Sequence, residues 1–130
     1  MASSYYKPCK ELDICEKLIN DYYKDGLYDK CFEGHLELAK KTRYPLACTQ
    51  VGYFYMEGIG VKKDLDEAFK WSLIAAEGGD RDGQANLAYL YENGYGCIKN
   101  HKKALYWYKK AANQNNDWAI SKLEQFKENN

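Results

Sequence analysis

The sequence predicts an all-α fold, a right-handed α-solenoid in which about seven helices stack as antiparallel hairpins. Three observations support this prediction: an internal repeat of 36 residues, apolar positions three and four residues apart within each repeat, and glycines where the helices would end. The 130-residue chain is 45% hydrophobic and contains only two prolines. This length and composition are typical of one folded domain.

The internal repeat aligns residues 47–82 with residues 83–118 without a gap, and nine positions are identical. Because aromatic residues, glycines and alanines all recur in order, the repeat is a structural unit rather than a compositional bias. The identical pairs are Tyr53 with Tyr89, Tyr55 with Tyr91, Gly58 with Gly94, Gly60 with Gly96, Lys63 with Lys99, Ala68 with Ala104, Trp71 with Trp107, Ala75 with Ala111, and Ala76 with Ala112.

Each repeat is expected to form two helices. In the first helix, Val51 and Tyr55 continue an apolar stripe in steps of four residues, and Gly58 suits a left-handed helix end because it lacks a Cβ atom. Asp64 in the first repeat and Asn100 in the second are the expected N-caps of the second helices. Trp71 lies on the apolar stripe of that helix among alanines, which allow a neighbouring helix to approach closely.

Residues on both sides of the repeats should cover their apolar ends, because one helical hairpin cannot bury its apolar face alone. Pro8 is the expected first residue of an N-terminal helix that ends at Gly26, and residues 28–42 are expected to form its partner. The predicted single domain therefore consists of a degenerate N-terminal helix pair at 8–46, repeats at 47–82 and 83–118, and a C-terminal capping helix at 119–128.

The first repeat resembles the Sel-one-like repeat (SLR) family, a relative of the tetratricopeptide repeats. In the second copy Gly83, Ala88 and Cys97 replace the usual Ala, Gly and Val. The resemblance implies an α-solenoid whose first helices line a concave face, and a non-catalytic adaptor or scaffold that binds other proteins. The resemblance rests on Ala47, Val51, Gly52, Tyr55, Gly58, Gly60, Val61, Asp64, Ala68, Trp71, Ala75, Ala76 and Gly79.

A polar and aromatic trough is expected on the side of the first helices opposite the core stripe. Tyrosines suit such a trough, because a rigid ring adds contact area and its hydroxyl can bind a peptide backbone. The trough would hold an extended or helical peptide; the alternative is that Tyr53 and Tyr89 only pack between adjacent helices. The predicted partner-binding residues are Gln50, Tyr53, Phe54, Glu57, Asn86, Tyr89, Asn93, Lys122 and Gln125.

Cys31 and His35 are the candidates for chemistry, because a spacing of four places a thiol and an imidazole on one face of a helix. A catalytic dyad also needs an oxyanion site, and a metal site needs further ligands such as Cys9 or Cys15. His35 aligns with Trp71 one repeat later, so the simpler interpretation is a packing residue. No catalytic residue, metal or cofactor is therefore expected.

Two further function classes remain as alternatives. One is a module that contacts nucleic acid through the basic stretch from Lys99 to Lys110, together with Tyr106 and Tyr108. A balance of 19 basic and 19 acidic residues argues against it. The other is a small-molecule hydrolase, because some cysteine-rich relatives of the family that the chain resembles are associated with β-lactam binding. Paired cysteines bridge the helices of each repeat in those relatives, whereas the two repeats here contain only Cys48 and Cys97.

The five cysteines are odd in number and form no CxxC pair, so reduced thiols are expected. No apolar run approaches the roughly 18 to 20 residues that a membrane span requires. The N-terminal residues lack the apolar region of a secretory signal, so the expected location is the cytoplasm unless a leader has been trimmed. A monomer that binds an unidentified protein or peptide, rather than nucleic acid, is expected.

Overall fold

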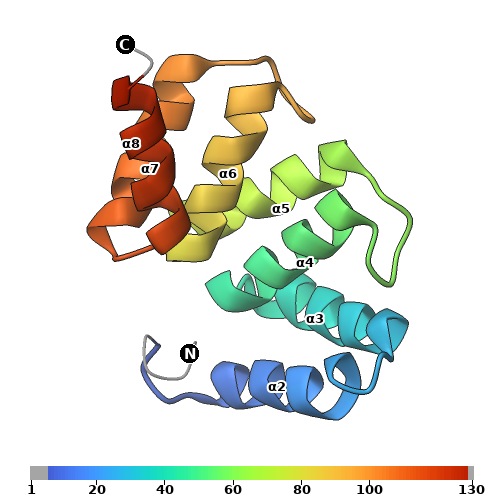
Figure 1. Ribbon diagram of the computed structural model, residues 1–130. Helices are drawn as coiled ribbons and strands as arrows, with labels where there is room; N and C mark the ends of the chain where they lie inside the picture. Colours follow the sequence, from blue (N-terminus) through green and yellow to red (C-terminus); the bar gives the residue numbers. More distant parts are fainter. Residues whose placement is uncertain (1–5, 129–130) are drawn as a thin grey trace.

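The computed structural model describes residues 6–128, and this part of the chain forms seven α-helices and no β-strand. Figure 1 shows them following one another as a stack from α2 to α8. A π-helical segment, Ile19–Tyr23, continues the first helix. The helices are α2 (Lys10–Leu18), α3 (Tyr28–Thr42), α4 (Pro45–Glu57), α5 (Leu65–Glu77), α6 (Arg81–Asn93), α7 (His101–Asn113) and α8 (Asp117–Glu128).

The helices pack as antiparallel hairpins, α2 with α3, α4 with α5 and α6 with α7, and α8 closes the stack against α7. Along the stack, α2 contacts α4 and α4 contacts α6 more closely than α3, α5 and α7 contact one another. The even-numbered helices therefore form the inner side of the solenoid. This architecture confirms the predicted fold class.

Glycines and polar caps set the ends of the repeat helices as the sequence predicts. Gly58 and Gly94 end α4 and α6 with φ of 69° in both cases, in the left-handed region that favours glycine. Asp64 Oδ1 accepts a hydrogen bond from the backbone N–H of Glu67 at 3.1 Å, and Asn100 Oδ1 accepts one from Lys103 at 3.0 Å. These bonds satisfy backbone donors that a helix start leaves free.

The N-terminal pair differs from the prediction at its first residue. Pro8 lies outside the helix, because Cys9 takes extended backbone angles (φ −161°, ψ 167°) and α2 begins at Lys10. The starts of α2 and α3 lie 18 residues apart, against 20 for α4 and α5, so this pair departs from the spacing of the two repeats.

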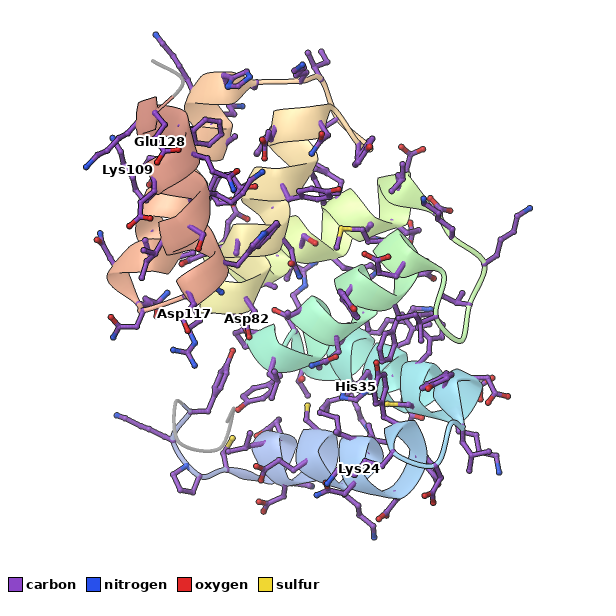
Figure 2. The ribbon with its side chains drawn as sticks, in the orientation of Figure 1. Lys24, His35, Asp82, Lys109, Asp117 and Glu128 are labelled. Carbon is purple, nitrogen blue, oxygen red and sulfur yellow. The ribbon has the colours of Figure 1, made fainter. Side chains whose placement is uncertain are left out.

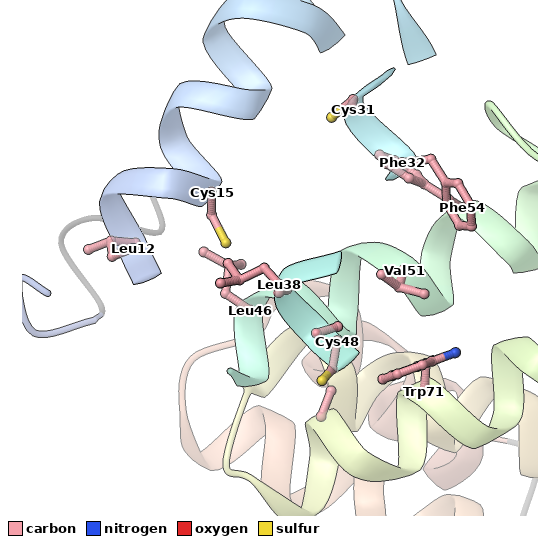
Figure 3. Close-up of a cluster of buried hydrophobic side chains, with 13 residues drawn as sticks. Leu12, Cys15, Cys31, Phe32, Leu38, Leu46, Cys48, Val51, Phe54 and Trp71 are labelled. Carbon is pink, nitrogen blue, oxygen red and sulfur yellow. The ribbon is translucent and has the colours of Figure 1, made fainter. Parts of the chain in front are cut away.

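The core of the N-terminal half lies between α2, α3, α4 and α5. His35 is fully buried in it and its ring lies edge-on to Phe54, whereas Lys109 and Glu128 lie at the outer edge of the molecule (Figure 2). Cys15 projects from α2 towards Leu38 and Leu46, which joins the N-terminal pair to the first repeat (Figure 3). The degenerate N-terminal pair is thus part of the same packed unit.

The turn between the two helices of each repeat rests on the start of the preceding hairpin's second helix. A Cβ atom at Gly60 would overlap the backbone oxygen of Tyr28, and one at Gly96 would overlap that of Leu65. Both glycines also have positive φ, 69° and 70°. Only glycine meets both demands, and this explains why the Gly-x-Gly pair recurs.

We predict that Gly96→Ala destabilises the fold more than Gly26→Ala. Both residues have positive φ, which costs a residue with a Cβ atom about 1–2 kcal/mol, but only Gly96 lacks space for that atom. Urea unfolding should show a loss for Gly26→Ala within that range and a clearly larger loss for Gly96→Ala. Equal losses would mean that the contact between turn and helix does not stabilise the stack.

Candidate protein-binding groove on the inner face

A groove of about 330 Å³ runs over the inner side between α4, α6 and the start of α8. Its walls combine carboxamides with two aromatic rings and one carboxylate. We call this site the inner groove. Its lining residues are Thr49, Gln50, Tyr53, Asp82, Ala85, Asn86, Asn116 and Trp118.

Small residues bring α4 and α6 together beneath the inner groove. A Cβ atom at Gly83 would lie 2.7 Å from Ala75 Cβ and 2.8 Å from Thr49 Oγ1. Thr49 is buried and its hydroxyl has no hydrogen-bond partner among the described residues. The replacement of the family's usual Ala by Gly83 therefore makes room for the Thr49 side chain.

Aromatic side chains form the exposed apolar part of the inner groove. Trp118 is 41% exposed and Tyr53 is 36% exposed. The Trp118 ring lies 5.5 Å from the Tyr89 ring and 5.8 Å from the Tyr108 ring, so it is fixed on one side and open on the other. Burial, followed by the charge of Glu57, raises the pKa of Tyr53, so its hydroxyl stays protonated at neutral pH.

Polar side chains at the starts of α6 and α8 form the rim of the inner groove. Asn116 Nδ2 donates to Asp82 Oδ1 at 2.9 Å, and Asn116 Oδ1 accepts from the backbone N–H of Ala119 at 2.8 Å. Figure 2 shows Asp82 and Asp117 at these neighbouring helix starts. The rim is thus acidic and held in place by its own hydrogen bonds.

The structure brings Gln50, Tyr53 and Asn86 together in the inner groove, and Tyr89 adjoins it through Trp118. Tyr89 also packs against Tyr95 in the turn that follows α6, with ring centres 5.9 Å apart, so part of its ring is covered by the chain itself.

The other predicted partner-binding residues lie outside the lining of the inner groove. Glu57, Asn93 and Gln125 are exposed. Lys122 pairs with Glu92, at 3.2 Å between Nζ and Oε1.

The prediction for Phe54 is wrong, because this side chain is 1% exposed and belongs to the core. Its ring packs near Phe32 and Tyr23, with ring centres 6.3 Å and 6.0 Å away. The aligned residue one repeat later, Leu90, is fully buried as well. That shared apolar character was the sequence signal for a core position.

Five residues of the inner groove were not predicted from the sequence: Thr49, Asp82, Ala85, Asn116 and Trp118. Trp118 aligns with Asp82 and Leu46, so the repeat gives no signal that an aromatic side chain would be exposed there. The position of Trp118 depends on how the last helix is set against α7.

Cys31 and His35 do not have the geometry of a catalytic dyad. His35 Nδ1 lies 2.9 Å from the backbone oxygen of Cys31, so this nitrogen carries the proton and donates. It therefore cannot accept the thiol proton, although Cys31 Sγ is 3.5 Å away. Both side chains are fully buried, and burial raises the pKa of Cys31 to about 11. The pair packs the core.

The described residues also contain neither a disulfide nor a cluster of potential metal ligands. All five cysteines are free thiols, so the bridges of the cysteine-rich relatives are missing here. Within residues 6–128, no three His, Cys, Asp or Glu side chains are grouped so that they could hold a metal ion. No helix in this part of the chain has the length and apolar character needed to span a membrane.

The basic stretch from Lys99 to Lys110 lies on the outer side of α7. Tyr108, which the nucleic-acid alternative would need as an exposed ring, is fully buried, and its hydroxyl donates to Glu92 Oε1 at 2.8 Å. Tyr106 is 53% exposed, but Lys110 Nζ lies 5.4 Å from its ring centre. The exposed aromatic rings on which nucleic-acid bases would stack are thus fewer than the sequence suggests.

Comparison with known families identifies the fold unit. The Sel1 repeat profile matches residues 45–80 and 81–116, two consecutive units that cover more than half of the 130 residues. The matches begin two residues before the boundaries chosen from the sequence and have the same period. The chain belongs to the Sel1 repeat family, whose members generally act as protein-interaction adaptors.

Solved structures with the same architecture support this assignment. The antigen c5321 of uropathogenic Escherichia coli, which displays an SLR fold, is 33% identical, with a TM-score of 0.74 over 87% of this chain and 24% of its own. A Sel1 repeat protein from Oxalobacter formigenes is 37% identical, with a TM-score of 0.72 over 87% and 44%. Cysteine-rich protein B of Helicobacter pylori is 29% identical, with a TM-score of 0.65 over 85% and 84%.

Two curated proteins share sequence with the chain. Chitin synthase regulator SKT5 of Saccharomyces cerevisiae is 47% identical over 62 residues, which are 48% of this chain and 9% of that protein. A sel1-like repeat-containing protein of Acanthamoeba polyphaga mimivirus is 34% identical over 94 residues, which are 72% of this chain and 17% of that protein. The chain thus spans less than a fifth of either relative.

We predict that His35 makes the fold less stable at acidic pH. Burial lowers the pKa of His35 below its usual 6.5, so the unfolded chain takes up a proton that the folded chain does not. Stability should therefore fall as pH drops through 6.5 towards the folded pKa, by at most about 1.4 kcal/mol per pH unit for one proton.

Urea unfolding between pH 7.5 and pH 5 checks this prediction. His35→Leu should have a weaker pH dependence than the wild type. The matched control is His101→Leu, which changes the chain's other histidine, an exposed one, and should keep the wild-type dependence. If His35→Leu keeps the wild-type pH dependence, His35 is not the group that lowers the stability of the fold at acidic pH.

Proposed function

We propose that this chain is a non-catalytic adaptor module that binds an extended or helical peptide, or a protein segment, in the inner groove. The observation that carries the proposal is the composition of the groove, in which Gln50 and Asn86 line the same hollow as the exposed rings of Tyr53 and Trp118. Carboxamides can donate to and accept from a peptide backbone, while the rings cover apolar side chains. We propose that the module acts as a single copy.

The volume and charge of the inner groove narrow the kind of partner. A hollow of about 330 Å³ accommodates a few side chains rather than a whole domain surface. Asp82 is the charged residue of the lining, and Asp117 lies exposed beside the rim. A segment with basic residues at that end of the groove would fit better than an acidic one.

Membership of the Sel1 repeat family supports an interaction role, and the yeast relative is itself a regulator by name. The hydrolase alternative is not favoured, because it depended on paired cysteines that are free here. Family membership does not identify the partner, so the inner groove and its chemistry carry the specific part of the proposal.

We predict that Tyr53→Ala combined with Asn86→Ala reduces capture of the partner by about tenfold or more, because central aromatic and hydrogen-bonding contacts dominate binding energy. The measurement is affinity capture from an extract of the cells that express the protein, quantified by mass spectrometry. The matched control is Tyr106→Ala, an exposed tyrosine on α7 outside the lining of the inner groove.

The control variant should capture the same proteins as the wild type. Both variants should keep the wild-type melting temperature, because Tyr53 and Tyr106 are exposed and Asn86 is only half-buried. If a folded Tyr53→Ala, Asn86→Ala variant captures the partner as well as the wild type does, the inner groove is not the binding site.

A further inference from the structure

Residues 6–9, ahead of α2, cross the starts of α4 and α6. Ahead of α2, the chain passes from Cys9, whose Sγ is 3.6 Å from the Tyr44 hydroxyl, to Tyr6, whose ring centre lies 5.3 Å from that of Tyr44. Tyr6 then donates its hydroxyl proton to Asp80 Oδ2 at 2.6 Å, across 74 residues of sequence. We call residues 6–9 the N-terminal strap.

The Tyr6 bond ends on a carboxylate that is 2% exposed. The other oxygen of Asp80 accepts backbone N–H groups of Asp82 and Gly83 at 2.7 Å and 2.9 Å and so caps α6. Oδ2 is not used in that cap and receives the phenol. Burial raises the pKa of Asp80, and the bond from Tyr6 opposes this rise, so the phenol helps to keep the carboxylate ionised.

The two residues that contact Tyr6, Tyr44 and Asp80, belong to a row of residues that recurs with the 36-residue period of the repeat. Tyr44, Asp80 and Asn116 are 36 residues apart and immediately precede α4, α6 and the first residue of α8. The N-terminal strap lies on the first two members of this row. Asn116, the third, lines the inner groove and donates to Asp82. The row and the inner groove are therefore continuous.

We propose that the row Tyr44–Asp80–Asn116 is a binding track for an extended segment that carries a tyrosine, and that the chain's own Tyr6 occupies it as an intramolecular ligand. This inference rests on the proposed function, because it adds a position specific for a phenol to the peptide site at the inner groove. A partner segment with a tyrosine at that position binds the track only by displacing the N-terminal strap.

The expected selectivity follows from the geometry of Asp80. A phenol supplies a ring for Tyr44 and a proton for the buried carboxylate, whereas phenylalanine supplies only the ring. A hydrogen bond to a charged acceptor is stronger than one to a neutral acceptor. We therefore expect a tyrosine segment to bind about tenfold more tightly than its phenylalanine counterpart.

The test uses the full chain with Tyr6→Ala, which removes the phenol from Asp80, labelled with nitrogen-15 for NMR. The probe is a synthetic peptide of residues 3–10 in which Cys9→Ser prevents oxidation. Adding it should shift the backbone signals of Asp82 and Gly83, the two amides that Asp80 caps. The same peptide with Tyr6→Phe should bind about tenfold more weakly. The control peptide with Lys7→Ala should bind like the original.

The wild-type chain should respond less than the Tyr6→Ala chain, because its own strap competes. If Tyr6→Ala loses the folded spectrum, Tyr6→Phe serves as the acceptor chain. Its strap still packs a ring on Tyr44 but lacks the bond to Asp80, so the peptide should displace it more readily than the wild-type strap. Absence of shifts at millimolar peptide, or equal binding of the tyrosine and phenylalanine peptides, would overturn the proposal. Neither result would affect the proposal that the inner groove binds a partner, because the Tyr53→Ala, Asn86→Ala variant tests that proposal separately.

Discussion

The contact between each Gly-x-Gly turn and the start of the preceding hairpin's second helix holds the stack together. At Gly60 and at Gly96 the backbone approaches so closely that a Cβ atom would overlap a carbonyl oxygen of the neighbouring unit. Residues 78–80 join the two successive hairpins, but this connection does not by itself fix the distance and angle between them. The turns provide this constraint, and the inner groove exists because α4 and α6 are held in this relation.

Small side chains make the same constraint possible inside the stack. Ala68, Ala75, Ala104 and Ala111 are fully buried at helix contacts, and large side chains fill the space that remains. At the crossing of α4 and α6, the usual alanine is replaced by Gly83, and Thr49 uses the space. The Thr49 hydroxyl is thus buried beneath the inner groove, beside the space that the Cβ atom of an alanine at position 83 would fill.

The sequence predicts the helices of the two repeats well because their signals are local and repeated. Capping by Asp64 and Asn100 and the left-handed ends at Gly58 and Gly94 all occur as expected. Phe54 was misplaced, because a stripe extended only in steps of four drifts around a helix with 3.6 residues per turn. From Val51, the buried face continues to Phe54, three residues on, while Tyr55 is only half-buried.

The candidate site is less predictable than the fold, because part of its lining depends on how the last helix docks and not on the repeated pattern of each helix. Gln50, Tyr53 and Asn86 follow from the helical face, whereas Trp118 and Asn116 depend on the docking of α8. The N-terminal strap has no signal at all in the repeat, since a bond between Tyr6 and Asp80 joins residues 74 positions apart. Such contacts arise from the tertiary structure alone.

The most direct test of partner binding in the inner groove is site-specific photo-crosslinking in cells. A photoreactive phenylalanine derivative replaces Tyr53 in the inner groove in one chain and Tyr106 on the outer side of α7 in another. If the partner binds in the inner groove, position 53 should yield a crosslinked protein that is missing from position 106. Adducts only from position 106, or the same adducts from both positions, would contradict the claim that the inner groove binds the partner.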